Sequence, residues 1–461
     1  MKMTPAKALA LFACACSSSA FAQETKNNST SGTKPRALAR IVWQDSSDPT
    51  LKWSDVTRGS DGLSIQPQAV AGFPKLDGEK QSFVQMEDSN GIVVVGIHDN
   101  DNGQFQSGWV ALSSGVTEEE HGDHSHWHFD QPPSILASKL DQEQSNPAHV
   151  YNYQGDIFLA NDKKNGFTLL TAAALSKANA TTTADSLARF YAGGGGHITL
   201  AAVDRQVCYA TWMDRDGENQ GRVDVIPLDI NSPGKGYSLK LPSGGLHGAT
   251  ANSGRIFFAP SDGIDWVEAD VGLKQRPDSV KINHLSLGQD TATGKPLRTG
   301  AFTNHGSHVL FTTGTKDSAT LCIIDAKSSE PVVNKISMPI EEGLAWTTPA
   351  CVRTATGKQY AFIFGDRRDS EVAESLSIVD LDPNADGNFS DAKVSKKLGV
   401  GPSKIVGHGG HHEVAFSASG RWAFIANPGD GTIWAISLSS LEVDSKTKVG
   451  GTPSRMVVVG G

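Results

Sequence analysis

The residue types best suited to bind a metal are concentrated in one short segment. Residues 118–130, "EEEHGDHSHWHFD", contain four of the fourteen histidines, together with three glutamates and two aspartates. Three of the histidines alternate along the chain, so an extended segment would place their imidazoles on one side. Histidine-rich tracts of this kind are typical of metal binding, and the alternative is a solvated polar loop without a ligand. The candidate ligands in this segment are His121, His124, His126 and His128.

A second set of histidines recurs at one position of an internal repeat. Each lies nine or ten residues before the apolar run of the following strand, and the set consists of His149, His197, His247 and His412. Equivalent positions of a repeat lie at one rim of the fold. We therefore expect at least two of them to share a metal or ligand site, against the alternative that each caps its own strand. His408 and His411, in "GHGGHHEV", are further candidates.

The ligand types favour zinc. Zinc takes about four nitrogen, oxygen or sulfur ligands, and neutral imidazole with carboxylate suits it. Copper(II) would bind the same set more tightly, so ligand type leaves the metal open. A separate segment, "DPNADGNF" within residues 382–393, has the D-x-N-x-D-G spacing of a calcium loop, but its twelfth position is Lys393. We predict Ca²⁺ there, with an ordinary Asp/Asn/Gly turn as the alternative.

Short runs rich in Val, Ile, Phe and Trp, bounded by Gly, Asp and Asn, predict an all-β chain. Seven units of strand, turn, strand, loop and strand start 48 to 65 residues apart, beginning near Ser82 and ending with the unit that starts at His411. Repeats of this order are typical of propeller blades. The prediction is a seven-bladed β-propeller over residues 37–461, with a histidine-rich loop at 117–133 inserted between the first two blades. Extra strands at both chain ends could complete one sheet and close the ring.

The N-terminal residues predict export. A lysine-bearing start, a short apolar run and "AFA" describe a signal peptide over residues 1–22, cleaved after Ala22, and a polar disordered leader follows at 23–36. Acylation at Cys14 or Cys16 is the alternative. We expect a periplasmic monomer without membrane insertion. The net charge of -9, which becomes -11 once the signal peptide with Lys2 and Lys7 is removed, argues against nucleic acid as a partner.

Three cysteines remain after the signal peptide, and Cys322 and Cys351 are the expected disulfide pair, with Cys208 left over. No nucleophile elbow, H-E-x-x-H, phosphate loop or haem motif occurs. We therefore expect a binding protein and no enzyme. Residues assembled from several blades could still form an enzyme or a small-ligand site in a histidine-lined channel, and an interaction scaffold is a third alternative.

The sequence resembles the periplasmic zinc metallochaperones of the AztD type. The resemblance lies in "EHGDH" at 120–124, in "LHGATANSGRIFFAPSDGIDWV" at 246–267, and in "HHEVAFSASGRWAFI" with "DGTIWAISL" in the last unit. It implies a secreted propeller that buffers zinc and delivers it to the solute-binding protein of a zinc ABC transporter. It also implies metal-binding roles for His121, His124, His197, His247 and His412. With the repeat, it suggests that the loop is a mobile arm reaching the rim that carries the channel histidines.

Overall fold

The computed structural model describes residues 36–461 apart from 61, 102, 123–124, 145, 215, 230–235, 316–317, 340–342, 368–373 and 407–408. The predicted signal peptide and nearly all of the predicted leader therefore lie outside the described residues. Within the part that is described, no helix is both long and apolar enough to cross a membrane.

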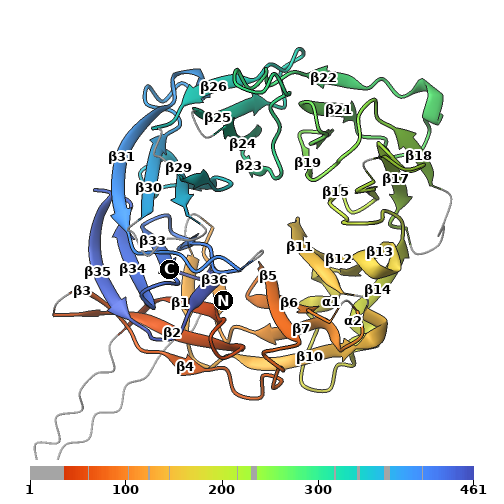
Figure 1. Ribbon diagram of the computed structural model, residues 1–461. Helices are drawn as coiled ribbons and strands as arrows, with labels where there is room; N and C mark the ends of the chain where they lie inside the picture. The colour runs from red at the N-terminus through yellow and green to blue at the C-terminus, as the bar shows by residue number, and fades with distance from the viewer. Residues whose placement is uncertain are drawn as a thin grey trace, which may run out of the picture. The chain divides into compact units, whose positions relative to one another are not determined.

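The all-β propeller is confirmed, but the number of blades is not. In the described chain, eight sheets of about four strands each stand radially around a central channel (Figure 1). The predicted seven repeat units all form blades. The eighth, which we call blade 1, is built by strands from the two ends of the chain.

Blade 1 joins the chain ends. Its strands are β1 (Ala37–Asp45), β2 (Thr50–Gly59), β3 (Gly62–Ile65) and β36 (Pro453–Val459), with β4 (Gln68–Ala69) paired to β2. β36 is innermost and pairs antiparallel with β1, from Arg40 opposite Val459 to Asp45 opposite Pro453. Pairing of the terminal strands is thus confirmed. The prediction of seven blades was wrong because β2 and β3 extend that pair into a complete sheet.

The other blades follow in chain order, each with its first strand innermost. Blade 2 contains β5 (Gln81–Ser89), β6 (Ile92–Asp99), β7 (Ser107–Ser113) and β10 (Ser134–Asp141). Blade 3 contains β11 (Pro147–Tyr153), β12 (Asp156–Asn161), β13 (Gly166–Leu170) and β14 (Ala188–Ala192). Blade 4 contains β15 (Leu200–Val203), β16 (Val207–Thr211), β17 (Arg222–Pro227) and β18 (Tyr237–Lys240). Short helices α1 (Ala172–Leu175) and α2 (Ala184–Leu187) lie between β13 and β14.

Blade 5 contains β19 (Ala249–Asn252), β20 (Arg255–Phe258), β21 (Ile264–Glu268) and β22 (Asn283–Leu285). Blade 6 contains β23 (Thr303–His305), β24 (His308–Thr315), β25 (Ser318–Asp325) and β26 (Asn334–Ser337). Blade 7 contains β27 (Ala345–Trp346), β28 (Ala350–Arg353), β29 (Gln359–Asp366), β30 (Glu374–Asp380) and β31 (Lys393–Val400). Blade 8 contains β32 (Glu413–Phe416), β33 (Trp422–Asn427), β34 (Thr432–Ser437) and β35 (Glu442–Lys448). Single 3-10 turns occur at Gln142–Gln144, Asp162–Lys164, Pro277–Ser279 and Phe389–Asp391.

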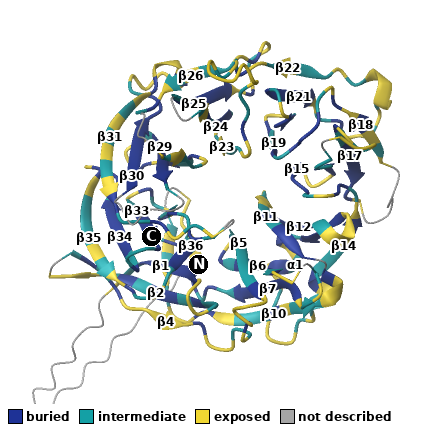
Figure 2. Cartoon of the chain, in the orientation of Figure 1, coloured by how far each residue is buried: buried dark blue, intermediate teal, exposed yellow. Residues whose placement is uncertain are grey.

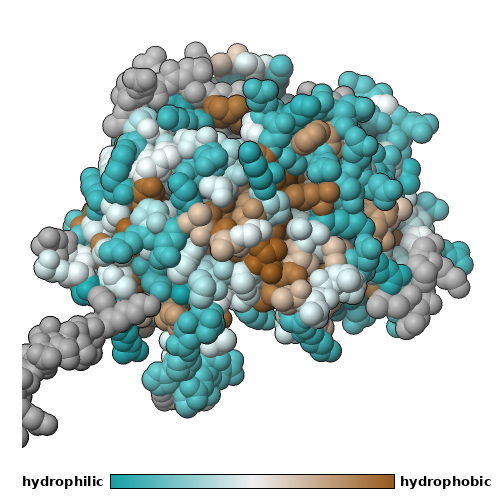
Figure 3. All heavy atoms as spheres, turned by 90° about the horizontal axis from the view of Figure 1, so that it is seen from below, coloured by the Kyte–Doolittle hydropathy of each residue, from teal (hydrophilic) through white to brown (hydrophobic). Residues whose placement is uncertain are grey.

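The hydrophobic core lies between neighbouring blades. Middle strands such as β12, "DIFLAN", and β33, "WAFIAN", are buried along almost their whole length because a blade packs on each of their faces. Outer strands such as β31 alternate between exposed and half-buried residues, which matches the yellow and teal rim of the ring in Figure 2. Hydrophilic residues cover much of the side seen in Figure 3, with apolar residues gathered near its centre.

The two cysteines predicted to pair are free thiols, as is Cys208. Cys322 on β25 faces the core between blades 5 and 6, whereas Cys351 on β28 packs against the core between blades 6 and 7. The two side chains therefore lie on opposite sides of blade 6. Burial raises the pKa of each thiol to about 12, which disfavours the thiolate that would bind a metal.

The antiparallel strands divide the loops between two rims of the ring. We call the rim where the innermost strands begin the start rim, and the rim where they end the end rim. In blade 2, Ser89 at the end of β5 pairs with Ile92, which pairs with Ser113 at the end of β7. Ser113 in turn pairs with Ser134 on β10. The chain between β7 and β10 therefore emerges at the end rim.

That connection carries a separate hairpin of β8 (Thr117–Glu120) and β9 (Ser125–His128). The predicted insertion thus exists, but it lies inside blade 2, between the third and fourth strands, and not between two blades. The reason is that β10, the outer strand of the blade, was not recognised beyond the insertion.

Candidate functional site

Three of the four repeat-phase histidines meet at the start rim. His149 lies on β11, while His197 and His247 lie just before β15 and β19 of the next two blades. The Nε2 atoms of His149 and His197 are 2.9 Å apart. The ring centre of His247 lies 5.1 Å from that of His197 and 6.5 Å from that of His149. Three adjacent blades therefore direct imidazoles to one place.

Two hydrogen bonds set the ring orientation and the tautomer in this group. His197 Nδ1 donates to Asp162 Oδ2 at 2.8 Å, and His247 Nδ1 donates to the Gly300 carbonyl at 3.1 Å. Each bond leaves Nε2 as the nitrogen with a lone pair in the neutral ring. Burial lowers the pKa of His247, which keeps that ring neutral near pH 7.

Asp162 was not among the residues proposed from the sequence. It follows β12 in "ANDKK" and opens a 3-10 turn, a position where aspartate usually serves the turn. Its Oδ1 accepts the backbone N–H of Ile198 at 2.9 Å, so the carboxylate is held while Oδ2 accepts the imidazole N–H of His197. Nothing in the local sequence distinguishes it from a turn residue, because its partner lies in the next blade.

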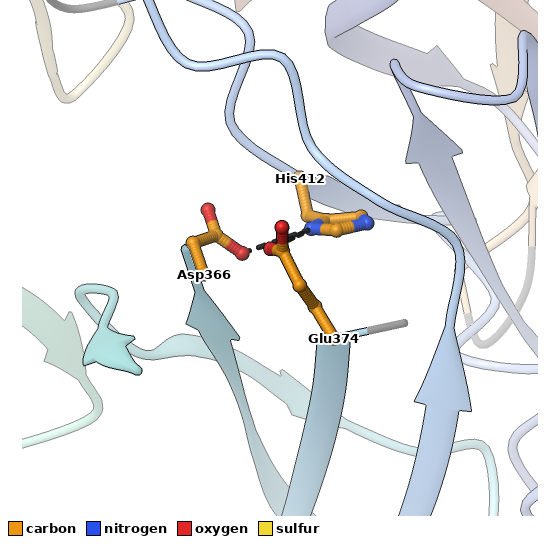
Figure 4. A group of neighbouring side chains, drawn as sticks. All are labelled: Asp366, Glu374 and His412. Atoms are coloured by element: carbon orange, nitrogen blue, oxygen red, sulfur yellow. Dashed lines mark hydrogen bonds and ion pairs between the residues drawn. The ribbon is translucent and has the colours of Figure 1, made fainter. Parts of the chain in front are cut away.

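The fourth repeat-phase histidine belongs to a different group. His412 Nδ1 lies 2.8 Å from Asp366 Oδ1 at the end of β29 and 3.5 Å from Glu374 Oε2 at the start of β30 (Figure 4). Among the described residues, these three form the one set whose ligand atoms all lie within 4.8 Å of one another. His411 Nδ1 contacts the other Asp366 oxygen at 2.9 Å. All three members of the set are buried.

The electrostatics of this second group suit a cation. Burial would raise the pKa of the Asp366 carboxyl, but hydrogen bonds from His411 and His412 outweigh it and lower the pKa to about 2. Burial raises the pKa of Glu374, and the neighbouring Asp366 charge raises it further. The buried atoms Glu374 Oε2 and His412 Nε2 make no hydrogen bond. Two buried carboxylates and an imidazole are a donor set that zinc accepts.

The remaining predicted ligands lie on the hairpin. Glu119 Oε2 is 3.0 Å from His128 Nε2, and Glu119 Oε1 is 3.5 Å from His121 Nε2. The rings of His121 and His126 are 5.0 Å apart in an edge-to-face arrangement. All four side chains are exposed on one face of the hairpin. His124 and His408, also predicted as ligands, lie outside the described residues.

The hairpin and the channel histidines lie at opposite rims. Trp127 and Phe129 pack beside Gly460, just beyond the end of β36, and the backbone carbonyl of Gln131 accepts a hydrogen bond from Arg40. Both contacts belong to the end rim. Because an inner strand of seven residues such as β11 spans about 20 Å, the hairpin lies well away from the channel histidines. The expectation that it reaches the rim of the channel histidines was wrong.

A cavity of about 940 Å³ opens from the channel beside both channel groups. It is lined by His247 on one side and by His411, His412 and Glu413 on the other, with residues of blades 6 and 7 between them. The two histidine groups therefore face a common space.

The segment predicted to hold calcium forms a turn stabilised by its own carboxylates. Asp382 Oδ1 and Oδ2 accept the backbone N–H groups of Asp386 and Gly387 at 3.0 and 3.1 Å, and Asp386 Oδ1 accepts that of Asn388. This is the hydrogen bonding of an Asx turn, the alternative to the calcium loop. Lys393 begins β31 and pairs with Asp380. Calcium binding at 382–393 stays a prediction.

Fold and site together define an eight-bladed β-propeller with histidine–carboxylate groups at one rim of its channel. Among solved structures it is similar to AztD from Citrobacter koseri in its apo form, with a TM-score of 0.58 and 16% identity over 92% of this chain and 99% of that one. A second crystal structure of Citrobacter koseri AztD gives 0.57 at the same identity and coverage.

The chain is also similar to the dihydro-heme d1 dehydrogenase NirN in complex with DHE, with a TM-score of 0.55 and 13% identity over 92% of this chain and 76% of that one. At these identities the likenesses establish the shared fold alone. No protein-family model matches the sequence, and no curated protein matches it.

Proposed function

We propose that this chain is a periplasmic zinc metallochaperone that buffers Zn²⁺ and delivers it to the solute-binding protein of a zinc ABC transporter. One observation carries the proposal: the Nε2 atoms of His149 and His197 face each other at 2.9 Å, and the hydrogen bond to Asp162 keeps the proton of His197 on Nδ1 and its lone pair on Nε2. Two imidazole nitrogens on one tetrahedral zinc ion, each about 2.0 Å from the metal, lie about 3.3 Å apart. A small movement of the rings would admit the ion, with His247 as a third ligand.

The second group supports the same function. His412, Asp366 and Glu374 form an oxygen-rich zinc site, and His411 lies at its edge, within reach of the cavity. Both groups contribute residues to the lining of one cavity, so a partner protein docking at the start rim could compete for either ion by ligand exchange. No covalent step is needed. The likeness in fold to AztD agrees with this proposal.

The test is isothermal titration of zinc into the mature chain, residues 23–461. We expect one or two equivalents to bind with a Kd below about 1 μM. The His197→Ala variant should lose an equivalent. The matched control is His284→Ala, because His284 Nδ1 also lies 2.8 Å from a carboxylate, that of Asp265, but on the outer strand β22.

Failure of wild-type protein to bind zinc more tightly than about 1 μM would end the proposal. Delivery is tested by mixing zinc-loaded protein with a purified zinc solute-binding protein. Transfer should be faster than the release of zinc to a chelator of equal affinity, because ligand exchange avoids the free ion.

A second candidate function is favoured by the cavity, whose volume of about 940 Å³ far exceeds that of an ion. In this alternative the channel is a small-ligand site or an enzyme active site, and the histidines act as acid–base groups. The His197→Ala and His247→Ala variants separate the two. A carrier would lose bound zinc and have no turnover to lose, whereas an enzyme would lose a measurable activity.

A further inference from the structure

The cavity beside the two histidine groups has the size of an organic ligand site. Its volume of about 940 Å³ lies within the range of about 300–1,000 Å³ that small-molecule sites occupy. Its walls come from blades 6, 7 and 8, with His247 of blade 5 and Arg455 of blade 1 at its edges. Because residues of five blades meet there, the lining can present different chemistry on different sides.

The charged lining of the cavity is more cationic than anionic. Arg298 and Arg455 both line it, against Glu413 as the one lining carboxylate among the described residues. Arg298 Nη2 donates to the Gly245 carbonyl at 3.0 Å, which holds its guanidinium at the wall, and Arg455 forms an ion pair with Glu413. Guanidinium groups bind carboxylates through paired N–H donors. Each of these two arginines therefore suits a carboxylate.

Three threonines of the lining present hydrogen-bond acceptors. Thr303 Oγ1 donates to the Pro349 carbonyl at 2.6 Å, and Thr313 Oγ1 donates to the Arg298 carbonyl at 2.8 Å. Thr312 Oγ1 similarly donates to the Thr347 carbonyl at 3.2 Å. A hydroxyl that gives its hydrogen to the backbone keeps lone pairs and acts as an acceptor toward a ligand. Each of these hydroxyls therefore suits a ligand that donates a hydrogen bond, as an alcohol does.

Apolar surface completes the lining. Trp346, Phe362 and Phe364 contribute rings between the polar groups, and these can contact a short carbon skeleton. We propose that the cavity binds a small hydroxycarboxylate, with its carboxylates on Arg298 and Arg455 and its hydroxyl on a threonine oxygen of the lining. The proposal goes beyond zinc delivery and does not depend on it, since none of these groups is among the proposed metal ligands.

The test uses two probes that differ in one hydroxyl. Citrate and tricarballylate carry the same three carboxylates, but tricarballylate lacks the hydroxyl. Isothermal titration of the metal-depleted mature chain, without added zinc, should give a Kd for citrate of about 100 μM or tighter. Tricarballylate should bind about tenfold more weakly, because the threonine oxygens then lose their donor.

Variants identify the groups involved. Arg298→Gln should weaken the binding of citrate and of tricarballylate alike, by at least about tenfold, because both probes carry the carboxylate that this arginine would bind. Thr303→Val should weaken citrate and leave tricarballylate unchanged. The matched control is Arg421→Gln, an exposed arginine outside the cavity, which should bind as wild type does. Thermal melting checks that each variant is folded.

Three results would overturn the proposal: a citrate Kd in wild type weaker than about 1 mM, equal binding of the two probes, or unchanged binding in a folded Arg298→Gln variant. Because zinc is absent from these titrations, their failure leaves the metal proposal intact. Failure of the zinc titration likewise leaves this one intact.

Discussion

The imidazoles of the channel are organised by carboxylates that come from other blades. Asp162 on blade 3 orients His197 of blade 4, and Asp366 on blade 7 orients His411 and His412 at the entry to blade 8. In each pair the carboxylate accepts from Nδ1. A carboxylate in this position fixes the ring, and at His197 it raises the basicity of Nε2, the nitrogen that would bind a metal.

The first prediction concerns this orienting role. Asp162→Asn should lower zinc affinity at the three-histidine site by about 10- to 100-fold while the number of bound equivalents stays the same. Isothermal titration measures both quantities. Asp265→Asn, which alters the similar pair with His284 on blade 5, is the control and should leave zinc affinity unchanged. An unchanged affinity in Asp162→Asn would remove Asp162 from the site.

The second prediction concerns the crowded carboxylates of the other group. Burial and the neighbouring Asp366 charge raise the pKa of Glu374, so its negative charge is less stable there than in water. Glu374→Gln removes that charge and can keep the hydrogen bonds that Oε1 accepts from Ser403. The metal-free variant should melt at or above the wild-type temperature, yet gain less stability from added zinc. Thermal melts with and without zinc give both values. An equal gain from zinc would exclude Glu374 as a ligand.

At the level of elements, the hairpin β8–β9 is an independent unit on the end rim. Its inward residue Trp127 packs beside Gly460, while Glu119, His121, His126 and His128 point outward. The antiparallel order of blade 2 decides this placement, because the third strand must end where the first one ends. A metal on the hairpin would therefore bind separately from the channel.

The third prediction follows from that separation. The combined substitution of His121, His126 and His128 by alanine should remove a weak zinc equivalent and leave the channel affinity unchanged within about twofold, because the sites are about 20 Å apart. These side chains are exposed, so the fold should be retained. Zinc is titrated separately into the triple variant, which lacks the hairpin histidines, and into His197→Ala, which lacks a channel histidine. A tenfold loss at the channel site would mean that the hairpin reaches it.

At the level of the whole molecule, blade 1 closes the ring with β36 from the far end of the chain. Buried Asp45 at the end of β1 is central to the junction. Its Oδ1 accepts the backbone N–H of Thr452 at 2.9 Å, and its Oδ2 pairs with Lys52 at 2.8 Å. Gly451 passes so close to this carboxylate that a Cβ there would lie 2.0 Å from Oδ2, and its φ is +62°.

The fourth prediction is that the contribution of Asp45, at the ring closure, to the free energy of unfolding depends on pH. Burial opposes ionisation of Asp45, but the hydrogen bonds from Lys52, Thr452 and Ser47 outweigh it and lower the pKa of Asp45 below its usual 3.8. A carboxyl with a lowered pKa stabilises the fold above that usual value, and the contribution is lost as the pH falls through the lowered pKa. Asp45→Asn should therefore cost about 1–3 kcal/mol at pH 7.

The cost of Asp45→Asn should shrink as the pH falls below 3.8. Denaturant unfolding of both proteins across this pH range is the measurement, with Asp48→Asn on the adjacent turn as the control. A cost that stays constant with pH would show that Asp45 acts through packing and not through its charge.

The order of residues alone predicts the all-β repeat and its seven in-line units. It also predicts the pairing of the terminal strands and the common phase of the channel histidines. These features depend on local periodicity and turn residues. The count of eight blades could not be predicted that way, because β2 and β3 have no repeat partner nearby and are recognised only through their pairing with β1.

The tertiary structure also decided which carboxylates meet which imidazoles and at which rim each group lies. The histidines that Asp162 and Asp366 contact lie 35 to 46 residues away in the sequence. Glu374 likewise contacts His412 of the next blade. Local sequence carries no signal for such contacts, since the packing of one blade on the next creates them. The hairpin lies at the end rim because successive strands of the blade run in opposite directions, so the third strand ends where the first one ends. This placement could not be predicted because β10, the outer strand that follows the hairpin, was not recognised in the sequence.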